Sequence, residues 1–409
     1  MIKEAGEGRK EVKMKILVVN CGSSTLKFQL IDSETEEVSA SGLCERIGLG
    51  GSITYKKEGE KYQEEVPFPD HGVAIQKVLD TLLDGEIGVL KSLSEINAIG
   101  HRLVHGGEKF ASSVVIDEEV IKAIESCNDL APLHNPANLL GVRACQKVMP
   151  GIPNVAVFDT AFHQTMPPKA YLYGLPKEYY KKYGVRRYGF HGTSHSFVSH
   201  RLAELAGLDI GNSKMIVCHI GSGASISAIK NGESIDTSMG MTPLEGLLMG
   251  TRSGDIDPAI IEFICSKEGI SVGEMTDILN KKSGALGVSG VSSDFRDLIE
   301  EMENGNEDAK NAVDIMIYRI IKYIGAYFVA LDGADAIALT AGIGENNAMV
   351  RERIMKGLAA IGVVPDLEAN AESGREHILT KPESKVAVWV IPTNEELAIA
   401  RETVRLVKK

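Results

Sequence analysis

Near its start the chain reads Lys15-Ile-Leu-Val-Val-Asn20-Cys-Gly-Ser-Ser-Thr-Leu-Lys27, and a later stretch repeats this pattern. The later stretch is Met215-Ile-Val-Cys-His-Ile-Gly-Ser-Gly-Ala-Ser-Ile226. Each copy is an apolar strand, then a tight turn of small residues, then a second apolar stretch. We therefore predict two related halves, and this repeat indicates the fold more strongly than any other feature.

The two turns suggest a phosphate site. Backbone N–H groups and hydroxyls converge at a turn of Gly and Ser, and such a turn can cradle a phosphate. The alternative is an ordinary hairpin in which Gly supplies a positive φ. Two copies facing one cleft favour the phosphate interpretation.

The size of the chain favours two domains with a cleft between them, because 409 residues exceed what one hydrophobic core usually serves. Apolar runs that suit strands alternate with amphipathic segments that suit helices, which predicts an α/β architecture. The strand-like runs are 16–20, 26–31, 155–158, 215–220, 226–229, 336–340 and 386–391. The helix-like segments include 117–127, 256–268, 309–331 and 395–407.

Composition excludes several classes of protein. The net charge of −12 and pI near 5.4 argue against general affinity for nucleic acid, which requires many unopposed cations. No apolar run approaches the length of a membrane span, so we expect no membrane insertion. The six cysteines show no C-x-x-C pairing, which fits reduced thiols in the cytoplasm and suggests no zinc site.

A third glycine turn, Thr340-Ala-Gly-Ile-Gly-Glu-Asn-Asn347, follows an apolar strand and precedes a helix that we expect to begin near Met349. Strand, glycine turn and helix in this order form a nucleotide-binding arrangement. The turn is neither the dinucleotide fingerprint nor a P-loop, and a purely structural turn is the alternative.

Three segments combine His, Arg and Gly at unusual density: 100–107, 131–136 and 188–195. They contain half of the ten histidines. Imidazole and guanidinium groups near loop ends can stabilise negative charge on a transferring phosphoryl group. The alternative for each histidine alone is a turn cap or a partner for a buried carbonyl.

Three further residues occupy positions suited to chemistry. Arg252 lies in a Gly-bounded turn, Asp159 ends a buried strand, and Glu395 opens the last helix. Carboxylates at strand ends commonly take part in the chemistry of α/β proteins. A surface arginine and simple capping carboxylates are the alternatives.

Together these residues give the chain a resemblance to the acetate kinase family. It rests on Asn20-x-Gly-Ser-Ser-x-x-Lys27, Gly-His-Arg102-x-Val-His-Gly-Gly, Phe-Asp159-Thr-Ala-Phe-His, Gly-Phe-His191-Gly-Thr-Ser-His, Met-Gly-Thr-Arg252-x-Gly and Pro-Thr-Asn-Glu395-Glu-Leu. The motifs occur in order over nearly the whole chain from Met14. The family belongs to the sugar kinase, Hsp70 and actin superfamily, so the resemblance implies two ribonuclease-H-like α/β domains with an active-site cleft between them.

The resemblance also implies domain limits. We expect a frayed extension at 1–13 and an N-terminal ribonuclease-H-like domain at 14–163 plus 397–409. The C-terminal ribonuclease-H-like domain, with the nucleotide site and a dimer surface, would span 164–396. The break at Gln164-Thr-Met-Pro-Pro168 predicts the first of these boundaries.

The implied activity is reversible phosphoryl transfer from ATP to acetate, giving acetyl phosphate and ADP with Mg²⁺, or with Mn²⁺ in its place. A carboxylate nucleophile carries no proton at neutral pH, so catalysis should rest on positioning and charge stabilisation. The family positions assigned to catalysis are Arg102, His134, Asp159, His191 and Arg252. We expect Asp159 to orient an arginine or a metal-bound water and not to take a proton.

The resemblance assigns the binding residues as well. Mg²⁺ would be held by Asn20 and Glu395, both oxygen donors. The substrate is expected to meet Arg102 and an apolar pocket of Val104, Leu133, Phe190 and Pro243. ATP is expected to meet Ser23, Thr25, Lys27, His219, Ile220, Gly221, Ser222, Gly223, Asp294, Phe295, Arg296, Gly342, Ile343, Gly344, Glu345 and Asn346.

One departure from the family pattern affects the nucleotide site. Relatives usually have Asn where this chain has Ser222, and serine offers one hydroxyl in place of an amide. We expect a weaker or altered nucleotide contact there without loss of activity. Thr25 in place of the common Ser keeps the hydroxyl.

The sequence is compatible with other functions as well. A small pocket at Val104 favours acetate, but one methylene is worth only about 1 to 3 kcal/mol, so a propionate or other short-chain acyl kinase is an alternative. A nucleotide switch of the actin or Hsp70 type and a carboxylate-binding regulator without turnover are further alternatives. Relatives are homodimers through the C-terminal domain, and we expect the same of this chain.

Overall fold

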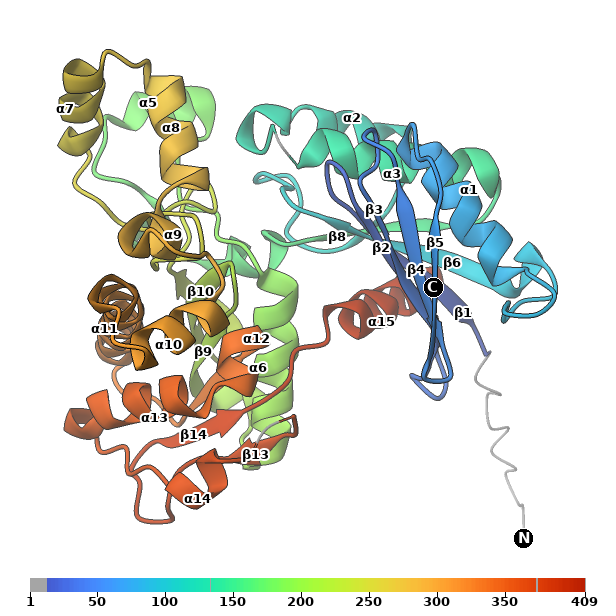
Figure 1. The fold of residues 1–409 in the computed structure, drawn as a ribbon. Helices are drawn as coiled ribbons and strands as arrows, with labels where there is room; N and C mark the ends of the chain where they lie inside the picture. Colours follow the sequence, from blue (N-terminus) through green and yellow to red (C-terminus); the bar gives the residue numbers. More distant parts are fainter. Residues whose placement is uncertain (1–12, 133, 373, 409) are drawn as a thin grey trace, which may run out of the picture. The chain divides into compact units, whose positions relative to one another are not determined.

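The computed structural model describes residues 13–132, 134–372 and 374–408. The chain divides into two compact units. The N-terminal unit contains the described residues up to Phe158 and those from Glu395 onward, and the C-terminal unit is Asp159–Asn394. Each unit has its own sheet (Figure 1).

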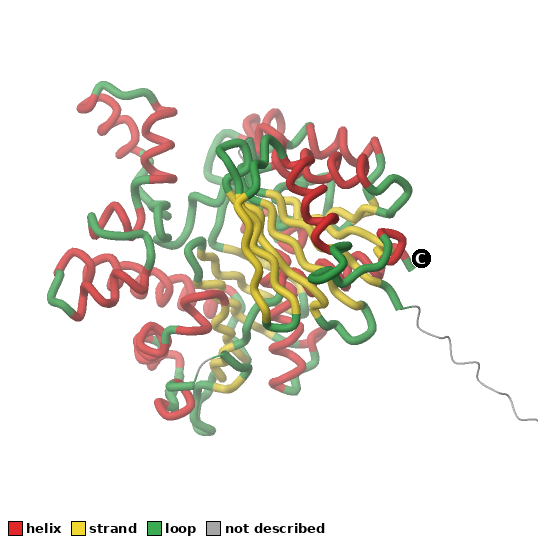
Figure 2. The backbone as a smooth tube through the Cα atoms, turned by 45° about the vertical axis from the view of Figure 1, so that its right-hand side comes forward, coloured by secondary structure: helices red, strands yellow, loops and turns green. Residues whose placement is uncertain are grey.

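The N-terminal sheet has the strand order β5-β4-β3-β2-β1-β6-β8-β7. Strands β1 to β5 form an antiparallel meander, while β1, β6 and β8 are parallel. Figure 2 shows the strands of the sheets as yellow tube. The bounds are β1 (Lys15–Cys21), β2 (Leu26–Asp32), β3 (Val38–Glu45), β4 (Ser52–Lys57), β5 (Glu60–Glu65), β6 (Ile96–Leu103), β7 (Val114–Val115) and β8 (Asn154–Phe158).

Helices cover both faces of this sheet, because side chains of β1 alternate between two cores. Leu17 and Val19 pack in the core beneath α1 and α3. Ile16 and Val18 pack on the other face with Ile399 of α15. The helices are α1 (His71–Leu82), α2 (Glu118–Glu125), α3 (Asn135–Val148) and α15 (Glu395–Val407), with 3₁₀ turns at Leu93–Glu95 and Asn128–Leu130.

The C-terminal sheet has the order β11-β10-β9-β12-β14-β13. The hairpin β9-β10 is antiparallel, and β9, β12 and β14 are parallel. The series β11-β10-β9-β12-β14 therefore repeats the series β3-β2-β1-β6-β8, and the predicted relation between the two halves is confirmed. The bounds are β9 (Lys214–Ile220), β10 (Ala224–Lys230), β11 (Glu233–Thr237), β12 (Ala336–Thr340), β13 (His377–Ile378) and β14 (Ala387–Val390).

Two long helices enclose the C-terminal sheet. Val198 and Leu202 of α6 pack against Met215 and Val217 of β9, and α11 packs on β9 and β10 from the opposite side (Figure 1). The helices are α4 (Pro168–Tyr171), α5 (Lys177–Tyr183), α6 (Gly192–Ala206), α7 (Ala259–Glu268), α8 (Val272–Lys281), α9 (Gly284–Ser289), α10 (Phe295–Glu303), α11 (Glu307–Ala330), α12 (Ala341–Asn346), α13 (Ala348–Gly357) and α14 (Leu367–Asn370). Shorter 3₁₀ turns lie at Ala161–Thr165, Ile210–Asn212 and Ala359–Ile361.

The division between units differs from the expected limits at 163 and 397. Segment 159–163 packs with the C-terminal unit, because Gly192 N donates to Asp159 O over 2.8 Å and the His163 ring bonds Phe190 O at 3.0 Å. Glu395 packs with the N-terminal unit, where it pairs with Arg102. Of the expected extension at 1–13, residues 1–12 lie outside the described residues.

The first two glycine turns do not have the backbone expected of a hairpin in which glycine supplies a positive φ. Gly22, Gly221 and Gly223 all have φ outside the left-handed region, so none of them supplies a positive φ. The third glycine segment forms the short helix α12 directly after β12, with Ala341 at φ +64° making the corner. Within the described part of the chain, no helix is both long and apolar enough to cross a membrane.

Candidate active site

The carboxyl ends of β1, β6 and β8 meet at one edge of the N-terminal sheet, as parallel strands require. The first turn of α3 ties this edge together. Asn138 donates from Nδ2 to Cys21 O over 2.6 Å and accepts from Val104 N at 3.1 Å. His134 precedes α3, and its carbonyl accepts from Asn138 N at 2.9 Å. His134 and Val104 are therefore held by one asparagine.

Ion pairs connect the β1-β2 hairpin and β6 to the start of α15. Asn20 and Lys27 are directly opposite in the β1-β2 hairpin, so their side chains share a face. The Lys27 ammonium forms an ion pair with Glu396, and the neighbouring Glu395 lies 3.8 Å from Arg102 Nε. Hence Lys27 has a carboxylate partner within the protein.

His191 stands at the N-terminus of α6 with an unusual backbone. Its φ of +56° and ψ of 23° lie in the left-handed region, which non-glycine residues rarely occupy and which concentrates at functional sites. Its Nδ1 is 2.9 Å from Ser225 Oγ. The ring stacks on His219, with centroids 4.2 Å apart and planes at 24°. This geometry fixes the direction of the His191 ring.

Two further histidines surround this pair. The sequence placed His195 in the His- and Gly-rich segment 188–195 without a role of its own, and it gave His163 no role. His195 Nε2 is 2.7 Å from the same Ser225 hydroxyl, and its ring meets His163 edge-on at 5.5 Å. Burial lowers the pKa of His163 to about 4, although Phe190 O and Asp159 both act to raise it. Burial also holds the pKa of His195 well below its usual range. These inner imidazoles are therefore neutral at pH 7.

Arg252 is a partly buried arginine that faces a glycine. Among the described residues, its guanidinium has no carboxylate within ion-pair distance, and its Nη1 makes only long contacts to Pro243 O (3.5 Å) and Met249 Sδ (3.8 Å). Burial lowers the pKa of Arg252. A Cβ placed on Gly223 would lie 3.5 Å from His191 Nε2 and 3.7 Å from Arg252 Nη1. His191 and Arg252 thus approach the same space beside Gly223.

Asp159 is the first residue of the C-terminal unit and directly follows β8. The residue is only 2% exposed, and its backbone carbonyl accepts from Gly192 N, which fixes the start of α6 beside it. Asp159 also acts electrostatically on His163. A buried carboxylate here can orient neighbouring polar groups.

The third glycine segment is held by its own glutamate. Glu345 Oε1 accepts from Ala341 N (2.7 Å), Thr340 Oγ1 (3.3 Å) and Thr393 N (3.0 Å). The buried Arg351 donates to Glu345 O over 2.7 Å from the other side. The Glu345 carboxylate therefore binds backbone of the protein at the ends of β12 and β14.

Other expected nucleotide residues are also engaged locally. Asp294 caps α10 and forms an exposed ion pair with Arg296 at 2.6 Å, while Phe295 is 4% exposed. Ser222 has an exposed side chain, and its carbonyl accepts from Gly250 N at 3.0 Å. The turn that carries Arg252 is therefore docked on the turn that carries Ser222.

Comparison with known proteins gives the family. The acetokinase family profile matches residues 15–401. The chain belongs to the acetokinase family. It is 63% identical over 395 residues to the acetate kinase of Lachnoclostridium phytofermentans, covering 96% of this chain and 100% of that protein.

Solved structures of this family share the fold. The acetate kinase of Porphyromonas gingivalis has a TM-score of 0.94 at 50% identity, covering 97% of this chain and 100% of that one. A propionate kinase from Francisella tularensis subsp. tularensis SCHU S4 has a TM-score of 0.91 at 43% identity, covering 96% and 100%. The fold of this acetokinase family member is thus the two-domain type of the actin, Hsp70 and sugar kinase superfamily, as expected.

The expected substrate pocket of this acetokinase family member is described in part. Val104 is 9% exposed in the N-terminal unit. In the C-terminal unit, Phe190 is 2% exposed and Pro243 contacts Arg252 through its carbonyl. Leu133 lies outside the described residues. The role of these side chains in acyl selection stays a prediction.

Proposed function

We propose that the chain catalyses reversible phosphoryl transfer between ATP and acetate, giving acetyl phosphate and ADP. The observation that carries this proposal is the approach of His191 Nε2 and Arg252 Nη1 to one space beside Gly223, in a member of the acetokinase family. Two such donors match the charge of a phosphoryl group in transfer. Identity of 63% to a named acetate kinase supports acetate as acceptor.

The transfer is direct and needs no general base. Acetate is ionised at neutral pH, so its oxygen can attack the γ-phosphorus in line while the bond to ADP breaks. Arg252, which lacks a carboxylate partner in the described chain, stabilises the transferring oxygens. His191 donates from Nε2 when the Ser225 hydroxyl donates to its Nδ1, or when the imidazole is protonated. Arg102 and His134 of the N-terminal unit act in the same reaction, and Asp159 orients and does not take a proton.

Mg²⁺ fits the donors at the edge of the N-terminal sheet. Asn20 and Glu395 supply one amide oxygen and one carboxylate, and no group of three or more His, Cys, Asp and Glu among the described residues suggests another metal site. Mg²⁺ binds through one or two protein oxygens, water and substrate phosphate, and Mn²⁺ can replace it. When bound, the ion would neutralise charge on the phosphates of ATP.

The nucleotide is proposed to bind the three glycine turns. The hairpin turns offer backbone N–H groups and the hydroxyls of Ser23, Thr25 and Ser222, which suit phosphate. The α12 segment has open space at Gly342, where an added Cβ would meet no atom within 4 Å, so a ligand can approach its backbone closely. This supports an adenosine position beside α12.

Two further properties are proposed for the assembled enzyme. Exposed apolar side chains on α7, α8 and α11, among them Phe263 (63%), Val272 (64%) and Tyr318 (61%), support a homodimer through the C-terminal unit. The six free cysteines support a reducing, cytoplasmic location.

Trapping of the acyl phosphate tests this function. The chain is incubated with ATP, Mg²⁺, acetate and hydroxylamine, and acetohydroxamate is measured. A kinase yields acetohydroxamate in proportion to ADP, whereas a nucleotide switch or a carboxylate-binding regulator yields none. Absence of hydroxamate with every short-chain acid would overturn the proposal.

A propionate kinase is the second candidate, because a solved structure at 43% identity carries that name. The same assay with propionate and butyrate separates the two candidates. We expect the highest kcat/KM with acetate. A higher kcat/KM with propionate would transfer the proposal to the second candidate.

A further inference from the structure

Arg252 and Pro243 lie on one long loop, which runs through 238–258 between β11 and α7 and contains neither helix nor strand. Backbone polar groups of such a loop lack the partners that helices and sheets provide. Scattered backbone bonds, such as Gly250 N to Ser222 O at 3.0 Å, hold parts of the loop, and side chains hold the rest.

Arg187 forms hydrogen bonds with the backbone at the beginning of this loop. Its Nη1 donates to three successive carbonyls, those of Thr237 (2.8 Å), Ser238 (3.1 Å) and Met239 (3.2 Å). Its Nη2 donates to Glu245 Oε1 over 2.6 Å. One guanidinium therefore joins the start of the loop to its middle.

Glu245 and Tyr173 complete what we call the Arg187 cluster, defined as Arg187, Glu245 and Tyr173. The second oxygen of Glu245 accepts from the Tyr173 hydroxyl, and that hydroxyl accepts from Met241 N at 2.9 Å. A Cβ on Gly240 would lie 1.8 Å from Glu245 Oε2, so the Glu245 carboxylate can occupy this position only because residue 240 is a glycine.

The cluster also connects the loop to the segment that carries His191. Tyr188 N and Gly189 N both donate to Gly240 O at 3.1 Å. Two residues after Gly189 the chain reaches His191. The positions of Arg252 and His191 are thus coupled through Gly240, which the cluster covers.

A second carboxylate closes the far end of the loop. Asp255 Oδ1 accepts from Gly246 N at 2.8 Å, Asp255 N donates to Gly246 O over 2.9 Å, and Tyr323 donates to Asp255 Oδ2 over 2.6 Å. Segment 246–255, which contains Arg252, is therefore a closed turn that begins one residue after Glu245.

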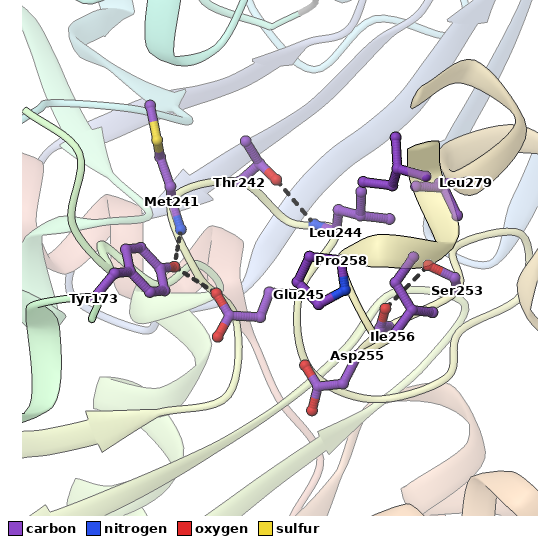
Figure 3. A pocket seen from close by; sticks show the side chains of 12 residues that line it. Tyr173, Met241, Thr242, Leu244, Glu245, Ser253, Asp255, Ile256, Pro258 and Leu279 are labelled. Carbon is purple, nitrogen blue, oxygen red and sulfur yellow. Dashed lines mark hydrogen bonds between the residues drawn. The ribbon is translucent and has the colours of Figure 1, made fainter. Parts of the chain in front are cut away.

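Side-chain packing leaves one side of this loop open. A cavity of about 460 Å³ lies beside the loop. Tyr173, Glu245 and Asp255 are among the side chains that line it (Figure 3). An open cavity removes dispersion contacts from its walls. Hydrogen bonds of the cluster must then fix the loop where side-chain packing does not.

We propose that the Arg187 cluster is a positioning device that holds Arg252 beside His191. This inference rests on the proposed function for its catalytic readout. Arg187, Glu245 and Tyr173 are positioning residues, because they act on the phosphoryl group only through the loop that carries Arg252.

Two mild substitutions test the device. Glu245→Gln removes the charge without loss of volume, and Tyr173→Phe removes the hydroxyl that joins Glu245 to Met241. We expect kcat/KM for acetate to fall by about 10- to 100-fold in each, because a displacement near 1 Å has an effect of this size. KM for ATP should stay unchanged.

The matched control is Arg201→Met in the same unit. Arg201 also binds two carboxylates, Glu376 at 2.5 Å and Glu204 at 2.6 Å, but it does so on the surface of α6. We expect wild-type kinetics from this control. Equal losses in Arg201→Met and Glu245→Gln would overturn the inference, since any broken ion pair would then have the same effect.

A double-mutant cycle separates positioning from general damage. Glu245→Gln is measured alone and in an Arg252→Lys background. If the cluster acts through Arg252, Glu245→Gln lowers kcat/KM much less in the Arg252→Lys background than in the wild type. Losses that simply multiply would overturn the inference.

Binding of inorganic phosphate, measured by calorimetry, gives a readout that needs no turnover. Glu245→Gln should weaken phosphate binding in the same direction as Arg252→Lys, even if the wild-type chain proved inactive with acetate. Inactivity with acetate would therefore count against the proposed function alone. Unchanged phosphate affinity in Glu245→Gln would overturn the positioning role of the cluster.

Discussion

His191 Nδ1 lies 2.9 Å from the hydroxyl of Ser225, and the same hydroxyl is 2.7 Å from His195 Nε2. One buried serine therefore fixes two imidazoles. The hydroxyl leaves Nε2 of His191 as the nitrogen directed toward Gly223. Ser225 thereby sets which nitrogen of His191 faces Gly223.

Ser225→Ala is expected to lower kcat by about 5-fold, because one hydrogen bond is worth roughly 1 kcal/mol and the His191 ring loses its anchor. KM for ATP should change little. Steady-state kinetics of the purified variant provide the measurement.

Ser227→Ala is the control for Ser225→Ala. Ser227 lies on the same strand, is equally buried, and bonds Thr237 in place of a histidine. It should lose stability without a selective loss of kcat. A drop in kcat common to both serine variants would contradict the anchoring role of Ser225.

His191→Asn separates the backbone of His191 from its chemistry. Asn accepts the left-handed conformation readily, so the melting temperature should stay near that of the wild type. We expect kcat to fall by about 10² to 10³, the usual effect of removing one donor to a developing charge. His191→Ala should lose both activity and some stability. Near-normal kcat in His191→Asn would show that the ring is dispensable.

The repeated hairpin could be predicted because its physical signal is local. Apolar residues flank both small-residue turns, and the structure has β1-β2 and β9-β10 at those places. The helical form of segment 341–346 could not be predicted in this way. Two glycines lower helix propensity, and the corner is made by Ala341 at a positive φ, which sequence does not reveal.

The candidate site could likewise be predicted only where its residues belong to local motifs. His191, His219 and Arg252 carry recognisable motifs, and the structure brings them together around Gly223 and Ser225. Arg187 and Glu245 are 58 positions apart and form their ion pair only through tertiary folding. Ordinary charged residues in unremarkable surroundings gave no sequence signal for that pair.

The free energy of unfolding should depend on pH through the titration of His101. Burial lowers the pKa of His101 from 6.5 to about 4, although its bond to Asn154 acts to raise it. The unfolded chain therefore binds this proton first as pH falls. The stabilisation is complete above pH 6.5 and is lost between pH 6.5 and 4, by about 3 kcal/mol.

His101→Gln should flatten this part of the stability profile, measured by urea unfolding between pH 7 and 4.5. His200→Gln is the control, because His200 is exposed on α6. An identical slope in wild type and His101→Gln would contradict the prediction.

Ser222→Asn tests the departure from the family pattern. An amide at this exposed turn offers a further donor to phosphate, so KM for ATP should fall by about 2- to 10-fold, the worth of one hydrogen bond. KM for acetate should stay unchanged. An unchanged KM for ATP would mean that the Ser222 side chain does not contact the nucleotide.

Val104→Ala tests the acyl pocket. Asn138 Oδ1 holds the backbone at Val104 N, so shortening the side chain should leave the backbone in place. Removal of its two methyl groups should raise the kcat/KM ratio of propionate to acetate by about 10-fold, because a methylene is worth roughly 1 to 3 kcal/mol in an apolar pocket.

Val142→Ala shows whether that change in ratio is specific to the pocket. Val142 lies on α3 in the same unit and is fully buried, so its truncation loosens the core to a similar extent. It should lower stability and leave the ratio of propionate to acetate unchanged. If Val104→Ala gains nothing on propionate, or if Val142→Ala gains as much, acyl size is not selected by Val104.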